Sequence, residues 1–73
     1  MDREIILKKF GKNVKIERIK KNLSQDDFAE ILGVSPNYIT RIETGRQNMS
    51  LAKIAELATA LNVEMEDLLK FRE

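Results

Sequence analysis

The sequence predicts an all-α fold, a compact domain of five short helices spanning residues 1–73. Three observations lead to this prediction. Helix breakers are scarce, since the chain holds three glycines and one proline among many helix formers. Apolar residues recur at spacings of three and four, and strict alternation is rare. Serines stand directly before several of these apolar runs, where they can cap helices.

The first helix is expected over about residues 4–21. Its apolar side chains fall on two opposite arcs instead of one stripe. One arc holds Ile6, Leu7, Phe10 and Val14, and the other holds Ile5, Ile16 and Ile19. We therefore expect this helix to lie between neighbours or to meet another chain. Asn22 is the expected stop.

The second helix is expected over residues 25–32, with Ser24 and Asp27 at the spacing of a capping box. Its buried residues are expected to be Phe28, Ala29, Ile31 and Leu32. Gly33 follows and can supply a positive φ at a tight corner.

The third helix is expected over residues 36–44, with Ser35 as its cap, Pro36 at its first position and Gly45 after its end. Two short helices joined around a glycine predict a helix-turn-helix motif over residues 25–45. An ordinary corner of a helical bundle is the alternative.

The fourth helix is expected over residues 51–61, capped by Ser50 and ended by Asn62. It is expected to bury Leu51, Ile54, Leu57, Ala58 and Leu61. A fifth helix is expected over residues 64–71, and its apolar side chains cover a wide arc: Met65, Leu68, Leu69 and Phe71. These four residues are candidates for a dimer interface, and a helix wrapped over the core is the alternative.

Composition excludes several kinds of chemistry. Cysteine and histidine are absent, so no disulfide, thiolate nucleophile or structural zinc site is expected. No apolar run is long enough to span a membrane, and the first residues lack the layout of a signal peptide. We expect a cytoplasmic protein that is not an enzyme, has no cofactor and takes no small-molecule substrate.

The net charge of +1 conceals a basic N-terminal third, because residues 1–23 carry eight basic and three acidic side chains. A solvated helix face explains this as well as a nucleic acid does, so charge permits DNA without arguing for it.

The outer face of the expected third helix is more informative. With Ile39 and Ile42 inward, a rotation of about 100° per residue places Asn37, Arg41 and Thr44 outward. Arginine can pair bidentately with guanine and asparagine with adenine, and this outer face holds no acid.

Two further places could hold phosphate. The N-terminus of the second helix offers free N–H groups beside Gln25. The polar residues Arg46, Gln47 and Asn48 follow the third helix, although an ordinary polar loop explains them as well.

At this point the residues are similar to a known family. The stretch LSQDDFAEILGVS at 23–35, followed by YITRIETGR at 38–46, resembles the Cro and phage-repressor class of helix-turn-helix proteins. The similarity covers about residues 10–70. It implies a lambda-repressor-like fold and a homodimer that binds a palindromic operator in double-stranded DNA and regulates transcription. Small members include phage repressors and controller proteins of restriction–modification systems.

The resemblance also implies roles for individual residues. Base contacts fall on Pro36, Asn37, Thr40 and Arg41. The resemblance places phosphate contacts at Gln25, Ser35, Thr44 and Arg46, and we expect further phosphate contacts at Tyr38 and Asn48. Arg18 and Glu43 match an arginine and a glutamate that pair between the first helix and the end of the third. The sequence departs from the family pattern at Pro36, where a polar residue is frequent, at Met49, where proline is common, and at Glu64, where a serine or threonine cap is usual.

Two other functions stay open. The domain could be an antitoxin-like module that binds a partner protein, or the DNA-reading fragment of a larger protein. Met1 at the start and a final helix close to Glu73 favour a complete chain over a fragment.

Overall fold

A computed structural model describes residues 2–71, and within these residues it holds five helices and no strand. The helices are α1 Arg3–Lys20, α2 Gln25–Leu32, α3 Pro36–Glu43, α4 Leu51–Leu61 and α5 Met65–Leu69. The all-α prediction is confirmed, and the first four helices match their expected bounds to within about one residue. The fifth was expected over residues 64–71 and is shorter, because the backbone of Lys70 is already extended.

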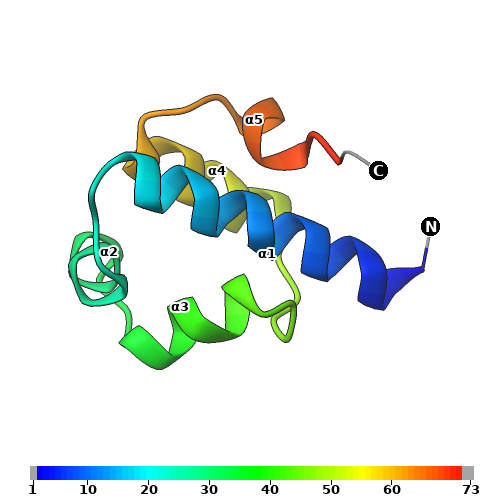
Figure 1. The fold of residues 1–73 in the computed structure, drawn as a ribbon, viewed down its shortest axis with the longest axis horizontal. Coiled ribbons are helices and arrows are strands. Elements are labelled where there is room, and N and C mark those ends of the chain that lie inside the picture. Colours follow the sequence, from blue (N-terminus) through cyan, green and yellow to red (C-terminus); the bar gives the residue numbers. More distant parts are fainter. Residues whose placement is uncertain (1, 72–73) are drawn as a thin grey trace.

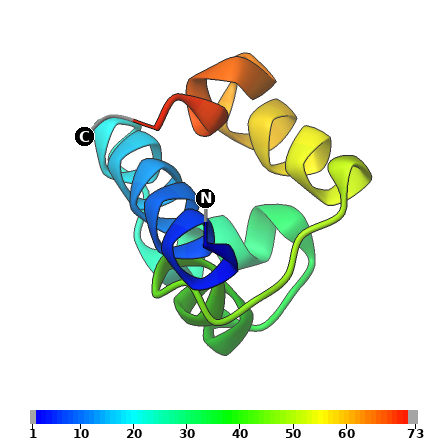
Figure 2. The same ribbon diagram turned by 90° about the vertical axis from the view of Figure 1, so that its right-hand side faces the viewer.

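Helix α1 runs through the middle of the molecule (Figure 1). It packs against α3 on one side and against α5 on the other, while α2 packs against α3 and α4. Figure 2 looks close to the axis of α1 and shows α3 below it and α5 above it. This arrangement explains the two apolar arcs in part. In the first arc Phe10 and Val14 are buried, and Ile6 and Leu7 are half-buried. In the second arc Ile5, Ile16 and Ile19 remain exposed.

Capping side chains begin the helices where the sequence predicts them. The Ser24 hydroxyl accepts from the Asp27 backbone N–H at 2.9 Å, and the Asp27 carboxylate accepts from the Ser24 N–H at 3.0 Å. Ser35 and Ser50 cap α3 and α4 in the same way. The capping box and both serine caps are therefore confirmed. Asp2 caps α1, which the sequence analysis did not anticipate.

Helix α5 begins with Glu64 and Asp67 at the spacing of a capping box. The backbone N–H of Glu64 donates to the Asp67 carboxylate at 2.9 Å. The departure from the family pattern at Glu64 therefore leaves the start of the helix within one residue of its expected position, and the helix is shortened at its other end, after Leu69.

The core is built from apolar side chains of all five helices: Phe10, Val14, Phe28, Ala29, Ile39, Ile42, Ile54, Leu57, Ala58, Leu61 and Leu68. Of the residues expected in the core, Leu32 is only half-buried against it, and two others are exposed. Ile31 is 56% exposed because it faces a groove beside Ala55 and Thr59 of α4, whose side chains are too small to cover it. Leu51 is 72% exposed because it opens α4, and that first turn lies at the edge of the molecule (Figure 2).

The expected dimer contact at Leu68 is also wrong. Leu68 has no exposed surface, because it packs into the core of its own chain. It therefore cannot contact a second chain. The Asn13 side chain holds this segment in place by donating to the carbonyls of Leu68 and Lys70 at 3.0 and 2.9 Å. The other three residues of the expected contact differ. Met65 and Phe71 are half-buried against the core, and Leu69 is 37% exposed.

Two backbones approach each other closely where α1 crosses the end of α3. A Cβ atom added at Gly11 would lie 2.3 Å from the carbonyl oxygen of Ile42 and 2.7 Å from that of Glu43. Gly45 lies against the backbone of Lys8 and has a φ of 77°. Only glycine permits this approach, which fixes the depth at which α3 sits on α1.

Candidate nucleic-acid interface

Helices α2 and α3 form the predicted corner. Gly33 ends α2 with a φ of 71°, the left-handed conformation that a tight turn between helices needs. Ile39 and Ile42 are buried beneath α3, at 0% and 1% exposure. The opposite face of α3 is therefore turned to solvent, with Asn37 and Arg41 exposed on it.

Few groups on this outer face oppose a negatively charged ligand. Pro36 is exposed at the start of α3 and Thr44 at its C-cap. The single acid of the helix, Glu43, is only 8% exposed. A solvent-facing surface of polar, uncharged and cationic groups results, and it is suited to contact with base edges and phosphates.

Arg18 and Glu43 lie together, as the resemblance implies. Arg18 Nε donates to Glu43 Oε2 at 2.6 Å, and Arg18 Nη2 donates to Glu43 Oε1 at 3.2 Å. The side chains are only 9% and 2% exposed. Arg18 Nη1 also donates to the Leu23 carbonyl at 2.7 Å. This buried pair joins α1, the segment before α2 and the end of α3.

Gln25 extends this network toward the surface. Its Nε2 donates to Glu43 Oε1 at 3.1 Å, and its Oε1 accepts from the Thr40 hydroxyl at 3.1 Å. Gln25, an expected phosphate contact, and Thr40, an expected base contact, are therefore hydrogen-bonded to each other. This coupling was not predicted, although Thr40 and Glu43 stand three residues apart and so share one side of α3.

Arg41 is held by two neighbours. Its Nε and Nη2 donate to Gln47 Oε1 at 3.1 and 2.5 Å, and its guanidinium carbon lies 5.8 Å from the centre of the Tyr38 ring. Tyr38 is half-buried and packs against the core. Gln47 was expected only as part of the polar loop that could hold phosphate, and nothing in its local sequence pattern indicates that its side chain turns back toward α3.

The remaining expected phosphate contacts flank α3 at both ends. Ser35 is exposed before the helix, although its hydroxyl accepts from the Tyr38 N–H at 3.3 Å. Thr44 is exposed at the other end, and its hydroxyl donates to the Thr40 carbonyl at 2.8 Å. Arg46 and Asn48 are exposed in the loop that follows.

The acids at the start of α2 are partly accounted for. A hydrogen bond from the Ser24 backbone N–H, supported by the Ser24 hydroxyl, holds the pKa of the Asp27 carboxyl below its usual value. Asp27 therefore stays ionised to lower pH and is directed at its own helix cap. Asp26 is exposed beside it.

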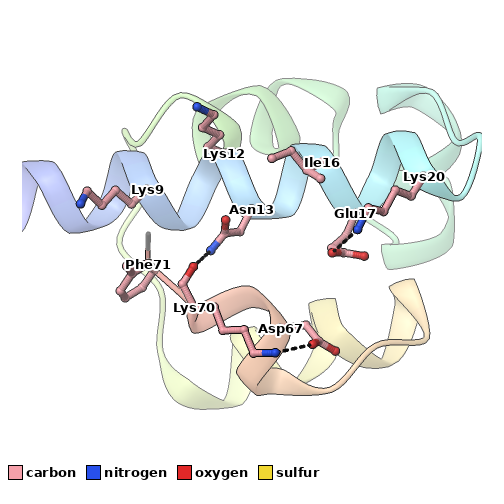
Figure 3. Close-up of a pocket in the computed structure, with 9 residues that line it drawn as sticks. All are labelled: Lys9, Lys12, Asn13, Ile16, Glu17, Lys20, Asp67, Lys70 and Phe71. Carbon is pink, nitrogen blue, oxygen red and sulfur yellow. Dashed lines mark hydrogen bonds and ion pairs between the residues drawn. The ribbon is translucent and has the colours of Figure 1, made fainter. Parts of the chain in front are cut away.

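A pocket of about 580 Å³ lies between α1 and α5, across α1 from α3 (Figure 3). Four lysines line it with Glu17 and Asp67, and two of them pair with these acids: Lys20 with Glu17 at 3.4 Å and Lys70 with Asp67 at 3.6 Å. None of the expected base or phosphate contacts lines it. Within residues 2–71 no cluster of acids suits a metal ion, and no helix is both long and apolar enough to cross a membrane.

Comparison with known proteins gives consistent matches. Residues 14–68 match the family described as helix-turn-helix. Control protein C.BamHI of Bacillus amyloliquefaciens is 40% identical over 63 residues, which cover 85% of this chain and 78% of that protein. The ImmF control region 10 kDa protein of Bacillus phage phi105 is 35% identical over 66 residues, covering 90% and 72%. The crystal structure of the restriction-modification controller protein C.AhdI from Aeromonas hydrophila has a TM-score of 0.79 at 40% identity, covering 85% of this chain and 94% of that one.

Proposed function

Because this chain belongs to the helix-turn-helix family, we propose that it binds a palindromic operator as a homodimer and controls transcription there. It is a DNA-binding transcriptional regulator. One observation carries the finer proposal: α3 presents Asn37 and Arg41 on a face free of exposed acids, on a helix fixed from below by buried isoleucines.

Helix α3 enters the major groove in this proposal. Arg41 donates to guanine O6 and N7, and Asn37 pairs with an adenine edge. Thr40 offers its hydroxyl to a neighbouring base. Pro36 cannot donate a hydrogen bond and instead packs on a thymine methyl group.

Phosphate contacts set the register of α3 in the groove. Gln25 donates to one phosphate at the N-terminus of α2, where the free N–H groups of the helix add their attraction. The other contacts come from Ser35, Tyr38, Thr44, Arg46 and Asn48. The bonds of Gln25 to Glu43 and Thr40 support this role, because they hold the amide in place while one Nε2 hydrogen stays free and the side chain remains half-exposed.

Two copies bind half-sites about one DNA turn apart, which multiplies the limited specificity of one helix. Leu69 is the exposed apolar residue of α5 and is proposed at this interface with the half-buried Met65 and Phe71. Sedimentation of a Leu69→Glu variant should show monomers. The matched control is Ile31→Glu, which places the same charge on another exposed apolar residue; dissociation by this variant alone would overturn the α5 interface.

Selection of bound duplexes from a random pool tests the proposal directly. A palindromic consensus is expected, whereas a consensus without symmetry would contradict the dimer. Arg41→Ala should cost about 1–3 kcal/mol at one base pair and leave binding to random DNA unchanged. Lys70→Ala removes one cation from the pocket across α1 and serves as the matched control. Equal losses on operator and random DNA would contradict base reading by Arg41.

We propose no catalytic reaction for this chain. We also propose that it acts in the cytoplasm, where its operator lies. The antitoxin-like alternative predicts a different outcome. A second polypeptide that co-purifies with the chain, combined with failure to select any duplex, would favour it.

A further inference from the structure

We propose that Gln47 is a specificity-determining positioning residue, which orients Arg41 for guanine. This inference rests on the proposed function, since it concerns how the outer face of α3, which we propose reads DNA, is preorganised in the free protein. Gln47 lies outside α3. It was expected only as part of a polar loop that could hold phosphate, and the base and phosphate contacts proposed above do not include it.

Gln47 and Tyr38 hold the Arg41 guanidinium from two sides. Gln47 Oε1 accepts from both Nε and Nη2 of Arg41, which is the side-on fork of the guanidinium. Gln47 Nε2 donates to the carbonyl of Asn48 at 3.2 Å, so the amide is held at both ends. The Tyr38 ring lies 5.8 Å from the guanidinium carbon and limits its movement on another side.

The bonds to Gln47 leave the other N–H donors of Arg41 available for DNA. An arginine has five N–H donors, and Gln47 takes one on Nε and one on Nη2. Both hydrogens of Nη1 and one of Nη2 stay free, and one hydrogen on each of these two nitrogens points along the end-on edge of the guanidinium. That end-on edge matches the two acceptors of guanine, O6 and N7. Gln47 therefore occupies the edge of Arg41 that base reading does not need.

The loop that carries Gln47 is itself fixed to α3. The backbone N–H of Arg46 donates to the Arg41 carbonyl at 2.8 Å, and that of Gly45 donates to the Ile42 carbonyl at 3.2 Å. Gln47 thus starts from a backbone position set by the helix whose side chain it holds. An arginine held in this way has less conformational freedom to lose on binding, and preorganisation of this kind increases affinity for the matching partner.

The test compares binding of four proteins to the selected operator, to an operator changed at the base pair read by Arg41, and to random duplex. The proteins are wild type, Gln47→Ala, Arg41→Ala and the double variant. Gln47→Ala should lower the preference for the operator over the changed operator by about two- to twelvefold, the equivalent of ordering one long side chain. Binding to random duplex and the dependence of affinity on salt should not change.

The double variant separates positioning from direct contact. If Gln47 acts through Arg41, Gln47→Ala has no further effect once Arg41 is alanine. A further loss there would mean that Gln47 contacts DNA itself and would overturn the inference. Tighter binding by Gln47→Ala would also overturn it, since Gln47 would then compete with DNA for Arg41.

A conservative variant provides the rescue. Gln47→Glu keeps an acceptor for Arg41, so it should restore the preference between the two operators while weakening binding to all DNA through its negative charge. Loss of preference in Gln47→Glu equal to that in Gln47→Ala would count against positioning. Arg41→Ala tests the proposed function separately. If this variant keeps the wild-type preference for the operator over the changed operator, base reading by Arg41 and the role of Gln47 are both rejected. If Arg41→Ala loses the preference and Gln47→Ala keeps it, only the role of Gln47 is rejected.

Discussion

Replacing Glu43 with alanine should lower the free energy of unfolding by about 3–5 kcal/mol, the usual result of removing one partner from a buried ion pair. The Arg18 side chain is 9% exposed and would lose both bonds to the carboxylate, keeping only its bond to the Leu23 carbonyl. A buried cation would then remain without its counter-ion. Gln25 would lose its acceptor on Glu43 as well.

The size of this effect is large for such a small domain. A chain of 73 residues has a total stability of about 4–11 kcal/mol. At roughly 4–8 °C per kcal/mol, the Tm of Glu43→Ala should fall by about 12–40 °C. An exposed pair gives a different expectation, because such pairs contribute about 0–1 kcal/mol.

Urea unfolding followed by far-ultraviolet circular dichroism measures this difference through the midpoint and slope of each transition. Glu56→Ala is the matched control, since Glu56 pairs with Lys53 at 3.4 Å and both side chains are about half exposed. Similar losses in Glu43→Ala and Glu56→Ala would refute the reasoning. If Glu43→Ala is unfolded without urea, the loss equals or exceeds the wild-type stability, which supports it.

Three further predictions concern single contacts. Gly11→Ala should lower the free energy of unfolding in urea by about 1–3 kcal/mol, because the new Cβ would lie 2.3 Å from the Ile42 carbonyl oxygen. Helix propensity alone favours alanine by about 1 kcal/mol, so the clash must outweigh it. A stabilised variant would show that α3 can shift. Asp27→Ala should lower the Tm at pH 7. Folding lowers the pKa of Asp27, so the stabilisation by this carboxylate is complete above its unfolded pKa of about 3.9 and is lost as pH falls through the lower folded value. The plots of Tm against pH for wild type and Asp27→Ala should therefore converge at low pH. A constant difference in Tm between them would contradict the role of the Asp27 carboxylate in capping α2. Leu68→Ala should cost about 2–5 kcal/mol and leave the dimerisation constant unchanged, as measured by unfolding and sedimentation.

The parts of this fold that follow from sequence are those set by short-range chemistry. Ser24, Ser35 and Ser50 were predictable as caps because a cap bonds to an N–H only two or three residues away. Gly33 was predictable at the corner because a positive φ is a property of that residue itself. Neither requires knowledge of what the helix packs against.

Burial at the ends of helices did not follow in this way. Ile31 and Leu51 have the spacing of core residues, but the neighbours that would cover them are small or absent from that side. Leu68 shows the reverse, since it was assigned to a surface contact and is fully buried. Spacing gives the direction of a side chain along its own helix, while the partner helix decides whether that direction is covered.

The same limit applies to the proposed DNA-reading face. The outward direction of Asn37 and Arg41 follows from helical rotation alone. The bonds of Gln25 to Glu43 and of Arg41 to Gln47 depend on the crossing of α2 and α3 and on a loop that turns back. The close approach at Gly11 is likewise invisible in the sequence, because a glycine inside a helix gives no sign of which backbone it faces.

Glu43 connects stability to the proposed DNA binding, and a double variant can separate the two. Replacing Arg18 with methionine and Glu43 with leucine removes both buried charges, so the stability should return to near or above the wild-type value. Gln25 would still lack its acceptor on Glu43 and would be less ordered at the proposed phosphate contact. Binding to operator and to random DNA should then weaken together, by roughly two- to twelvefold, the equivalent of one net hydrogen bond. Unfolding curves and binding isotherms of the same samples give both quantities. Wild-type affinity in the stable double variant would show that the buried pair serves the fold alone. A loss of affinity restricted to the operator would mean that Glu43 acts on base reading through Thr40 instead of through the phosphate contact of Gln25.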